Sequence, residues 1–295
     1  MQNRERFLFR NRKSVKETEE RNGMKKQDEL IETVITKESL TQALESVGIG
    51  RNMILEAHVS LSSLGYVAGG ARTVVDAIMD LITDGGTLLM ATQTADNTDP
   101  SEWVNPPVLP SLWQEIRDSM PAYNPENTDL CYMGKVAENF RHRRNVIYSN
   151  HPAVSFAAWG RYAKLLCNRQ SMHFPLAEES PAARMYELKG YVLLIGTDLS
   201  TATCLHLAEY RTECRPIIIR SSCTLVDGRR NWKRYLDLDI DSSDFEKIRA
   251  QLTKKNLIRE IMLNTSCRIQ VFPVSAAVDE ATRYFEKNAI YDLYR

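Results

Sequence analysis

The stretch from residue 53 to residue 81 constrains the fold of this chain more than any other. It begins with the apolar run Met53-Ile54-Leu55, which has strand character, and it ends with apolar residues at helical spacing, Val74, Ala77, Ile78 and Leu81. Between them, residues 57–70 are rich in serine and glycine. Glycine lets the backbone approach a ligand, and free N–H groups at a helix start favour an anion. The pattern therefore predicts a strand, a ligand-binding loop and a helix, although an ordinary strand-to-helix turn has the same spacing.

Further strands are expected along the chain. Asp84-Gly85-Gly86 turns the chain into the apolar run 87–91, and this order of strand, helix and strand favours parallel pairing. Another buried strand is predicted at 191–196, followed by a loop at 197–203 and a helix at 204–210. We therefore expect an α/β fold with a mixed, mostly parallel central sheet flanked by helices. Ligands are expected at the carboxyl ends of its strands.

The last third of the chain is predicted to be β-rich. Strands are expected at 216–225, 231–238 and 268–274, with helices at 242–252 and 276–286. The turn Asp227-Gly228-Arg229-Arg230 between the first two strands is typical of a hairpin.

Length and composition favour one large domain with a short extension. The chain has 295 residues, of which 43% are hydrophobic, so it can bury a sizeable core. Residues 1–30 are crowded with Arg, Lys and Glu, and they hold too few apolar residues for a signal peptide or a membrane span. We interpret 1–30 as a solvated N-terminal extension and 31–295 as a single α/β domain of a cytoplasmic protein.

Charge and cysteine content argue against several classes of protein. The 38 acidic and 38 basic side chains give a formal net charge of zero, which is unlike a nucleic-acid binder that relies on bulk positive charge. The six cysteines form no C-x-x-C pair, so reduced thiols are expected and a zinc site is not. We expect no metal, no nucleic acid and no membrane partner. The oligomeric state, monomer or dimer, is left open.

His206 and Glu209 are the main candidates for catalysis. They lie three residues apart on an expected helix, so their side chains share one face. A carboxylate beside one ring nitrogen fixes the tautomer, and the other nitrogen can then accept a proton. This spacing predicts a general base with an orienting partner, or alternatively a surface pair. A metal site would need more donors, and Cys204 as a nucleophile would point elsewhere on the helix.

Two more histidines have alternative interpretations. His151 precedes a proline at a turn beside Ser149, so it could be the base instead, or it could only brace the chain. His58 ends the first predicted strand, and we interpret it as a hydrogen-bonded structural residue near a cofactor rather than as a catalyst.

An acidic and aromatic cluster lies in the long, proline-interrupted segment 92–132. Such segments inside compact domains are often functional. Carboxylates with aromatic walls can hold ammonium groups of a polycationic substrate, and the candidates here are Asp96, Asp99, Glu102 and Trp103. A solvated acidic turn is the alternative.

Several segments together resemble one known family. His58-Val59-Ser60-Leu61-Ser62-Ser63-Leu64-Gly65 with Gly69-Gly70 resembles the signature of the aminoglycoside 3-N-acetyltransferases, antibiotic N-acetyltransferases without the GNAT fold. Other segments agree in that family's order, namely 84–90, 99–103, 133–138, 151–160 and 203–209. The resemblance covers residues from about 36 to 220.

The resemblance implies a cosubstrate and a reaction. Acetyl-CoA would supply an acetyl group for direct transfer to a 3-amine of an aminoglycoside, with His206 as base and Glu209 as its partner, and antibiotic resistance would follow. Other acceptor amines, or a non-catalytic CoA-binding homologue, are the alternatives. The pantetheine and thioester would lie along Ser60, Leu61, Ser62, Ser63, Leu64 and Gly65, with His58, Met133, Arg141 and Ser149 also on the cofactor side.

Some positions depart from the family pattern. Tyr148-Ser149 replaces an Arg-Ser pair, which leaves the basic run 141–144 as the candidate for the CoA phosphates, unless it is only a solvated face. Residues 264–270 lack the glycine that the family usually has before its last strand, so contacts of that loop are in doubt.

Overall fold

The structure is a computed structural model that describes residues 31–288. The predicted extension, residues 1–30, lies outside the described residues. The chain divides into two compact units, Met1–Val34 and Ile35–Arg295, and the short strand β1 (Val34–Ile35) lies at their boundary. The fold and the sites below belong to the second unit.

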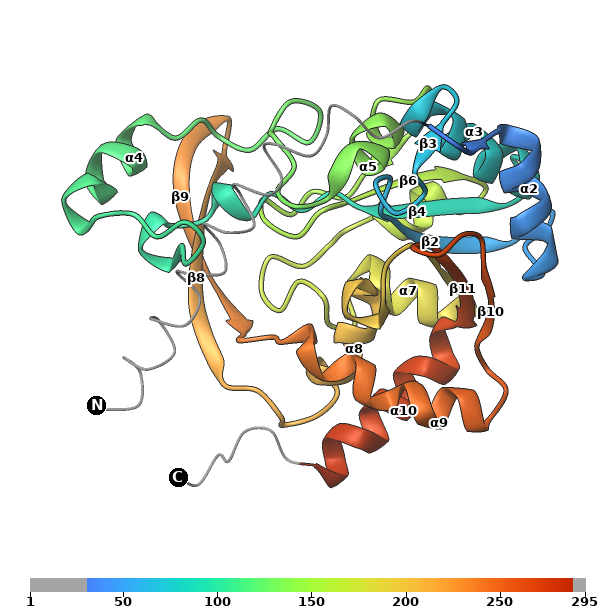
Figure 1. Cartoon of the computed structure of the whole chain (residues 1–295). Helices are drawn as coiled ribbons and strands as arrows, with labels where there is room; N and C mark the ends of the chain where they lie inside the picture. The colour runs from blue at the N-terminus through green and yellow to red at the C-terminus, as the bar shows by residue number, and fades with distance from the viewer. Residues whose placement is uncertain (1–30, 289–295) are drawn as a thin grey trace, which may run out of the picture. The chain divides into compact units, whose positions relative to one another are not determined.

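A mixed sheet of seven strands forms the centre of this unit (Figure 1). In spatial order its strands are β10 (Arg259–Met262), β11 (Arg268–Pro273), β7 (Tyr191–Ile195), β2 (Ile54–Val59), β4 (Thr87–Ala91), β6 (Phe156–Gly160) and β5 (Ile147–Tyr148). The predicted mixed α/β sheet is confirmed. β2 pairs in parallel with β4 and with β7, as the strand, helix and strand pattern predicted.

The sheet is less parallel than we predicted. Outside the β4–β2–β7 centre the remaining pairings are antiparallel, so the expectation of a mostly parallel sheet is corrected. On one side, the turn after Met262 reverses the chain, which makes β10 and β11 a hairpin. On the other, the long segment after β4 returns so that β6 runs against it. Apolar periodicity marks a strand but carries no information about its direction.

Helices cover both faces of the sheet, so its strands are apolar on both sides. Leu88 and Met90 of β4 pack in one hydrophobic cluster, and the alternating residues Leu89 and Ala91 pack in the other. The first cluster includes α2 (Lys37–Ser46), α3 (Gly70–Ile82) and α5 (Gly134–Arg141). The second includes α6 (Ala163–Cys167), α7 (Pro181–Glu187), α8 (Leu207–Tyr210), α9 (Arg249–Lys254) and α10 (Val274–Lys287).

The predicted strand, loop and helix unit is present as β2, residues 60–69 and α3. Gly69 precedes α3 in the left-handed conformation, with φ of 82°, which favours glycine at that position. Short elements complete the fold, namely β3 (Tyr66–Val67) and the 3₁₀ helices η1 (Ala95–Asn97), η2 (Pro100–Glu102), η3 (Pro110–Leu112), η4 (Leu199–Thr201), η5 (Thr203–His206) and η6 (Ser242–Ile248).

A long two-stranded ribbon stands beside the sheet. The predicted hairpin is present as β8 (Ile217–Val226) and β9 (Arg229–Leu238). Its two-residue turn, Asp227-Gly228, has positive φ at both positions, as type I′ turns require. Helix α4 (Trp113–Ser119) lies next to the ribbon (Figure 1), where the Trp232 indole N–H donates to the Arg117 carbonyl at 2.9 Å.

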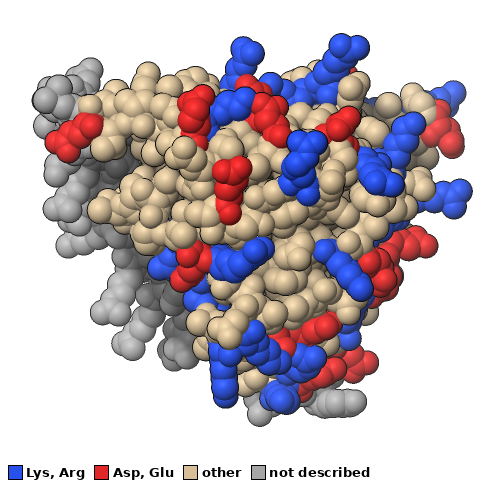
Figure 2. All heavy atoms as spheres, turned by 90° about the vertical axis from the view of Figure 1, so that its right-hand side faces the viewer, with Lys and Arg blue, Asp and Glu red and all other residues tan. Residues whose placement is uncertain are grey.

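Charged side chains on the surface are mixed in sign. On the face shown in Figure 2, Lys and Arg are interspersed with Asp and Glu, as a net charge of zero suggests. Within residues 31–288, no helix combines the length and apolar character that a membrane crossing requires.

Candidate active site

A cavity of about 400 Å³ opens at the carboxyl ends of β2 and β4. We call it the inner cavity. Its lining comes from β2 and β4, from α5 with the residues before it, and from the loop after β7, as predicted for the ligand site of such a sheet. The lining includes two histidines, His58 and His206.

His206 and Glu209 form the pair that their spacing predicted. Nδ1 of His206 contacts Oε2 of Glu209. The imidazole is 12% exposed, and its ring packs edge to face on Phe245 with 4.8 Å between ring centres. In the described part of the chain, Nε2 of His206 has no hydrogen-bond partner, so this nitrogen is available to a molecule in the cavity.

Glu209 is buried within a polar network. Its Oε1 accepts from Arg215 Nε at 2.5 Å and from the Asp241 N–H at 3.0 Å. Burial by itself raises the pKa of Glu209, but the hydrogen bond and charge of His206, with these donors, bring the pKa below its ordinary value. Glu209 is therefore a carboxylate at neutral pH and can stabilise a protonated His206.

His58 is also backed by a buried carboxylate. It follows Glu56 on the same face of β2, and its Nε2 lies 3.4 Å from Glu56 Oε1. The Thr203 N–H also points to His58 Nε2, at 3.4 Å. Sequence reasoning treated His58 as structural and passed over Glu56, although a glutamate inside an apolar strand was a signal.

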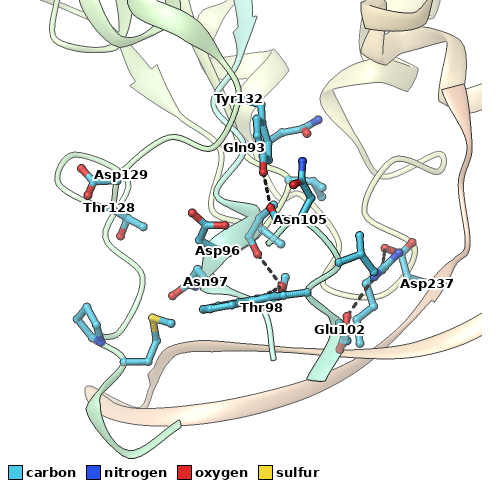
Figure 3. Close-up of a pocket in the computed structure, with 18 of the residues that line it drawn as sticks. Gln93, Asp96, Asn97, Thr98, Glu102, Asn105, Thr128, Asp129, Tyr132 and Asp237 are labelled. Carbon is cyan, nitrogen blue, oxygen red and sulfur yellow. Dashed lines mark hydrogen bonds and ion pairs between the residues drawn. The ribbon is translucent and has the colours of Figure 1, made fainter. Parts of the chain in front are cut away.

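A second, larger pocket of about 820 Å³ shares Gln93 and Tyr132 with the inner cavity. We call it the outer pocket. Gln93 and Tyr132 lie together at one end of it, and the Tyr132 hydroxyl donates to the Asn105 carbonyl at 2.7 Å (Figure 3). The two hollows therefore meet at these two side chains.

Three of the four predicted substrate-binding residues line the outer pocket, namely Asp96, Glu102 and Trp103. Glu102 accepts from Arg220 at 3.0 Å, and burial raises its pKa. Asp99 does not line the pocket. Arg117 binds it through two hydrogen bonds of 2.8 Å, which lower its pKa to about 2 although burial opposes this. Asp99 thus stabilises the loop.

The outer pocket has two further carboxylates that sequence reasoning missed. Asp129 lies on one side, and Asp237 lies with Glu102 on the other (Figure 3). Asp237 accepts from the Tyr210 hydroxyl at 2.5 Å and forms an ion pair with Arg220. Asp129 belongs to the same acidic segment as Asp96, and Asp237 is a charged residue within a half-buried strand, so both had a weak signal.

His151, the alternative base, is fully buried and does not line the inner cavity. Its Nδ1 accepts from the N–H groups of Ala153 and Val154 at 3.2 and 3.1 Å, and its Nε2 lies 3.3 Å from the Met172 carbonyl. Burial lowers its pKa to about 4. Both ring nitrogens are engaged by the backbone, so the geometry favours the bracing role.

The predicted cofactor residues divide into two groups. His58 and Met133 line the inner cavity, whereas Ser149 is buried and hydrogen-bonds to Gln170 and to the Phe156 N–H. Arg141 is 3% exposed, and its guanidinium donates to the Thr128 carbonyl at 2.7 Å and to Glu138 at 2.8 Å. The structure therefore does not bring Arg141 or Ser149 to the cavity.

The serine-rich loop begins at the edge of the inner cavity. Val59 lines the cavity and Ser60 follows it, but residues 60–65 themselves are not among the lining residues. The Ser60 hydroxyl bonds to those of Ser62 and Ser63 at 3.2 and 2.7 Å, and Ser63 donates to the Gly196 carbonyl at 3.1 Å. These contacts tie the loop to the end of β7.

The part of the chain that the structure describes holds no metal site built from cysteines or acidic residues. All six cysteines are free and buried. Within residues 31–288, no group of three or more His, Cys, Asp or Glu side chains could hold a metal ion.

Comparisons with known proteins define the class of the protein. The model of the aminoglycoside 3-N-acetyltransferase family matches residues 57–286. This family is a class of acyltransferases. The chain belongs to the aminoglycoside 3-N-acetyltransferase family.

Individual relatives agree with this assignment. The SPbeta prophage-derived aminoglycoside N(3')-acetyltransferase-like protein YokD of Bacillus subtilis strain 168 is 40% identical over 255 residues, covering 86% of this chain and 93% of that protein. Its crystal structure matches with a TM-score of 0.84 over 88% of this chain and 97% of that chain, at 37% identity. Aminoglycoside N(3)-acetyltransferase VIII of Streptomyces fradiae is 36% identical over 220 residues, covering 72% and 75% of the two chains.

A more distant enzyme shares the fold. AAC-IIIb, solved as a binary complex with CoASH, matches with a TM-score of 0.76 over 87% of this chain and 98% of that chain, at 21% identity.

Proposed function

We propose that this protein transfers the acetyl group of acetyl-CoA directly to an amine of an aminoglycoside, the 3-amine, with His206 as general base and Glu209 as its partner. The single observation that carries the proposal is the His206–Glu209 pair in a cavity that meets an acidic pocket. Residues 31–295 would act as one catalytic domain in the cytoplasm. Acetylation would remove a positive charge that the antibiotic uses to bind RNA, which would confer resistance.

The inner cavity is the proposed site of the thioester. Its walls are mostly neutral. Met133 lies just before α5, Val136 and Ala137 lie on α5, and Thr197, Ser200 and Thr201 follow β7. Such a surface suits the uncharged pantetheine arm. The loop 60–65 would hold the arm at the cavity edge. The related fold of AAC-IIIb binds CoASH, which supports the choice of cosubstrate.

The outer pocket is the proposed site of the acceptor. Four carboxylates line it, those of Asp96, Glu102, Asp129 and Asp237. Among the described residues, Arg220 is the one cationic side chain that lines it. This excess of negative charge favours a substrate with several ammonium groups, and the half-buried Trp103 offers an aromatic face to it. An acceptor lying here could place one amine past Gln93 and Tyr132 toward His206.

The reaction needs a neutral amine and a held thioester. The nitrogen of the acceptor amine attacks the acetyl carbon, and Nε2 of His206 takes a proton from the amine in the same step. Glu209 stabilises the imidazolium that forms. Because both substrates occupy adjoining hollows, much of the rate enhancement would come from holding them in contact. No acetyl-enzyme intermediate is required. Cys204 is fully buried, and burial together with Glu56 raises its pKa, so it is a poor nucleophile.

A substrate panel tests this proposal. The protein is incubated with acetyl-CoA and a set of aminoglycosides, release of the CoA thiol is followed, and the new acetyl group is located by NMR. We expect thiol release that depends on the acceptor and an acetyl group on the 3-amine. Release with simple polyamines but with no aminoglycoside would assign another acceptor class, and no release with any amine would contradict catalysis.

A further inference from the structure

The inner cavity contains two imidazole–carboxylate pairs, and the proposed function uses only one of them. His206 is paired with Glu209, and His58 is paired with Glu56. Both carboxylates are completely buried, and the two imidazoles are 11% and 12% exposed. The pairs come from different elements, η5 with α8 in one case and β2 in the other, yet both imidazoles line the same cavity.

The two carboxylates have opposite surroundings. Glu209 is held by Arg215 and by the Asp241 N–H in addition to His206. Glu56 lies in the central strand β2, and its Oε2 accepts one hydrogen bond, from the Cys204 N–H at 3.2 Å. Its Oε1 is buried and has no hydrogen-bond partner within residues 31–288.

Glu56 therefore needs a proton nearby. A buried carboxylate without a compensating charge is costly, and removing the cost takes either a cation or a proton. No arginine or lysine pairs with Glu56 in the described part of the chain. Burial raises the pKa of Cys204, so its thiol stays neutral. The one ionisable partner of Glu56 among the described residues is His58, whose Nε2 lies 3.4 Å from Oε1. A proton shared by this pair is therefore what can offset the buried charge.

His58 can pass such a proton toward the cavity. Its Nε2 faces Glu56 Oε1 and accepts from the Thr203 N–H, which requires a lone pair on Nε2 and places the ring proton on Nδ1. Nδ1 has no hydrogen-bond partner among residues 31–288 and is not among the fully buried atoms. Glu56 Oε1 and His58 Nε2 face each other at 3.4 Å, so a proton can pass between them.

We propose that Glu56 and His58 form a proton relay that protonates the sulfur of the departing CoA. This rests on the proposed function, in which the thioester occupies the inner cavity. The C–N bond forms as the C–S bond breaks, and His206 Nε2 takes the proton of the amine. His58 Nδ1 gives its proton to the sulfur while Glu56 gives one to His58 Nε2. The products are the amide and CoASH. His58 Nδ1 then takes a proton from water in the cavity while Nε2 returns its proton to Glu56, and His206 releases the proton it took from the amine.

A change of leaving atom tests the relay. In the selenoester analogue of acetyl-CoA, selenium replaces the thioester sulfur, and a selenolate leaves without protonation because a selenol is a much stronger acid than a thiol. With acetyl-CoA, His58→Asn and Glu56→Gln should each lower kcat about 10²-fold. With the selenoester, most of that loss should disappear. His206→Asn is the matched control, and it should lose activity equally with both donors.

The same loss with both donors for His58→Asn would show that His58 only shapes the cavity, and would overturn the relay. Thermal unfolding of each variant shows whether it folds. Failure of the proposed function looks different, because the wild-type protein itself would then release no thiol.

A measurement that needs no acceptor tests the proton on Glu56. The infrared difference spectrum between the wild-type protein and Glu56→Gln at neutral pH should show the carbonyl band of a protonated carboxyl group. The matched spectrum for Glu209→Gln should instead show carboxylate bands. Carboxylate bands for Glu56 together with a neutral His58 in ¹⁵N NMR would overturn the proposal whatever the enzyme acetylates.

Discussion

The carboxylate of Glu209 contacts Nδ1 of His206 and is itself held by Arg215 and by the Asp241 N–H. Nε2 is thereby the nitrogen that faces the cavity. The Glu209 carboxylate, held by these three contacts, favours the His206 tautomer that carries its proton on Nδ1. This geometry suits the proposed role of His206, because a base held in this orientation needs no rearrangement before it accepts a proton.

Glu209→Gln should weaken the base without emptying the cofactor site. The amide can donate to Nδ1, which favours the wrong tautomer, so kcat should fall about 10²- to 10⁴-fold while the Kd of acetyl-CoA stays the same. Steady-state kinetics and calorimetric titration measure the two quantities. Equal kcat values for the variant and the wild-type protein would contradict the role of Glu209.

The same substitution should change how stability depends on pH. The folded pKa of Glu209 lies below its ordinary value of 4.5, so its contribution is fully present above the unfolded pKa and is lost as the pH falls through the folded one. The difference in denaturant midpoint between the wild-type protein and Glu209→Gln should therefore shrink as the pH is lowered below 4.5. A difference in midpoint that grows as the pH is lowered would contradict the lowered pKa of Glu209.

His151→Gln should affect stability rather than catalysis. His151 is neutral in the fold, with a pKa of about 4 against 6.5 for a free imidazole, so the unfolded chain binds the proton first. Its contribution is present above pH 6.5, falls as the pH drops and levels off below about pH 4. The variant should lose this slope in denaturant titrations and should keep the wild-type kcat at pH 7.5. A large loss of kcat in a folded variant would restore His151 as the base.

Asp129→Asn should weaken acceptor binding selectively. Asp129 lines the outer pocket and has no ion pair within residues 31–288, so its charge is free to attract an ammonium group. We expect a rise of about 3- to 10-fold in KM for the acceptor, smaller at high salt, with KM for acetyl-CoA unchanged. Asp84→Asn, in the exposed turn before β4, is the matched control. A change in KM for acetyl-CoA alone would contradict this prediction, because it would show that Asp129 acts on the binding of acetyl-CoA and not of the acceptor.

Arg141→Met tests whether this arginine holds the fold or the cofactor. The structure buries it against the Thr128 carbonyl and Glu138, so its loss should lower the free energy of unfolding by about 1–3 kcal/mol. If neither Arg141 nor Arg144 binds a phosphate of CoA, the KM for acetyl-CoA should be unchanged both in Arg141→Met and in the control variant Arg144→Met. A tenfold rise in KM for acetyl-CoA, specific to Arg141→Met, would restore the predicted phosphate contact.

Local patterns in the sequence predicted the parts of the site that depend on spacing along one element. The i, i+3 spacing of His206 and Glu209 was sufficient for that pair, and the β2, α3, β4 order was sufficient for the parallel centre of the sheet. The resemblance then added the cosubstrate.

Relationships between distant segments were not accessible in the same way. Asp99 and Asp96 look alike in the sequence, but Arg117 on α4 pairs with Asp99 and leaves Asp96 to line the pocket. Arg141 and Ser149 carry suitable groups for a cofactor, yet both are turned into the core. The surroundings of Glu56 could not be predicted from the sequence, because they arise where η5 packs against β2 and brings the Cys204 N–H to Glu56 and the Thr203 N–H to His58.

The most direct test of His206 as the general base is the turnover of the His206→Asn variant with acetyl-CoA and an accepted aminoglycoside. The affinity of the same variant for CoA is measured alongside. We predict that kcat at pH 7 falls about 10²- to 10⁴-fold and that the Kd of CoA is unchanged. The difference in kcat from the wild-type protein should become smaller at high pH, where the acceptor amine loses its proton without a base. A variant that folds, binds CoA and turns over within a few-fold of the wild-type rate would contradict it.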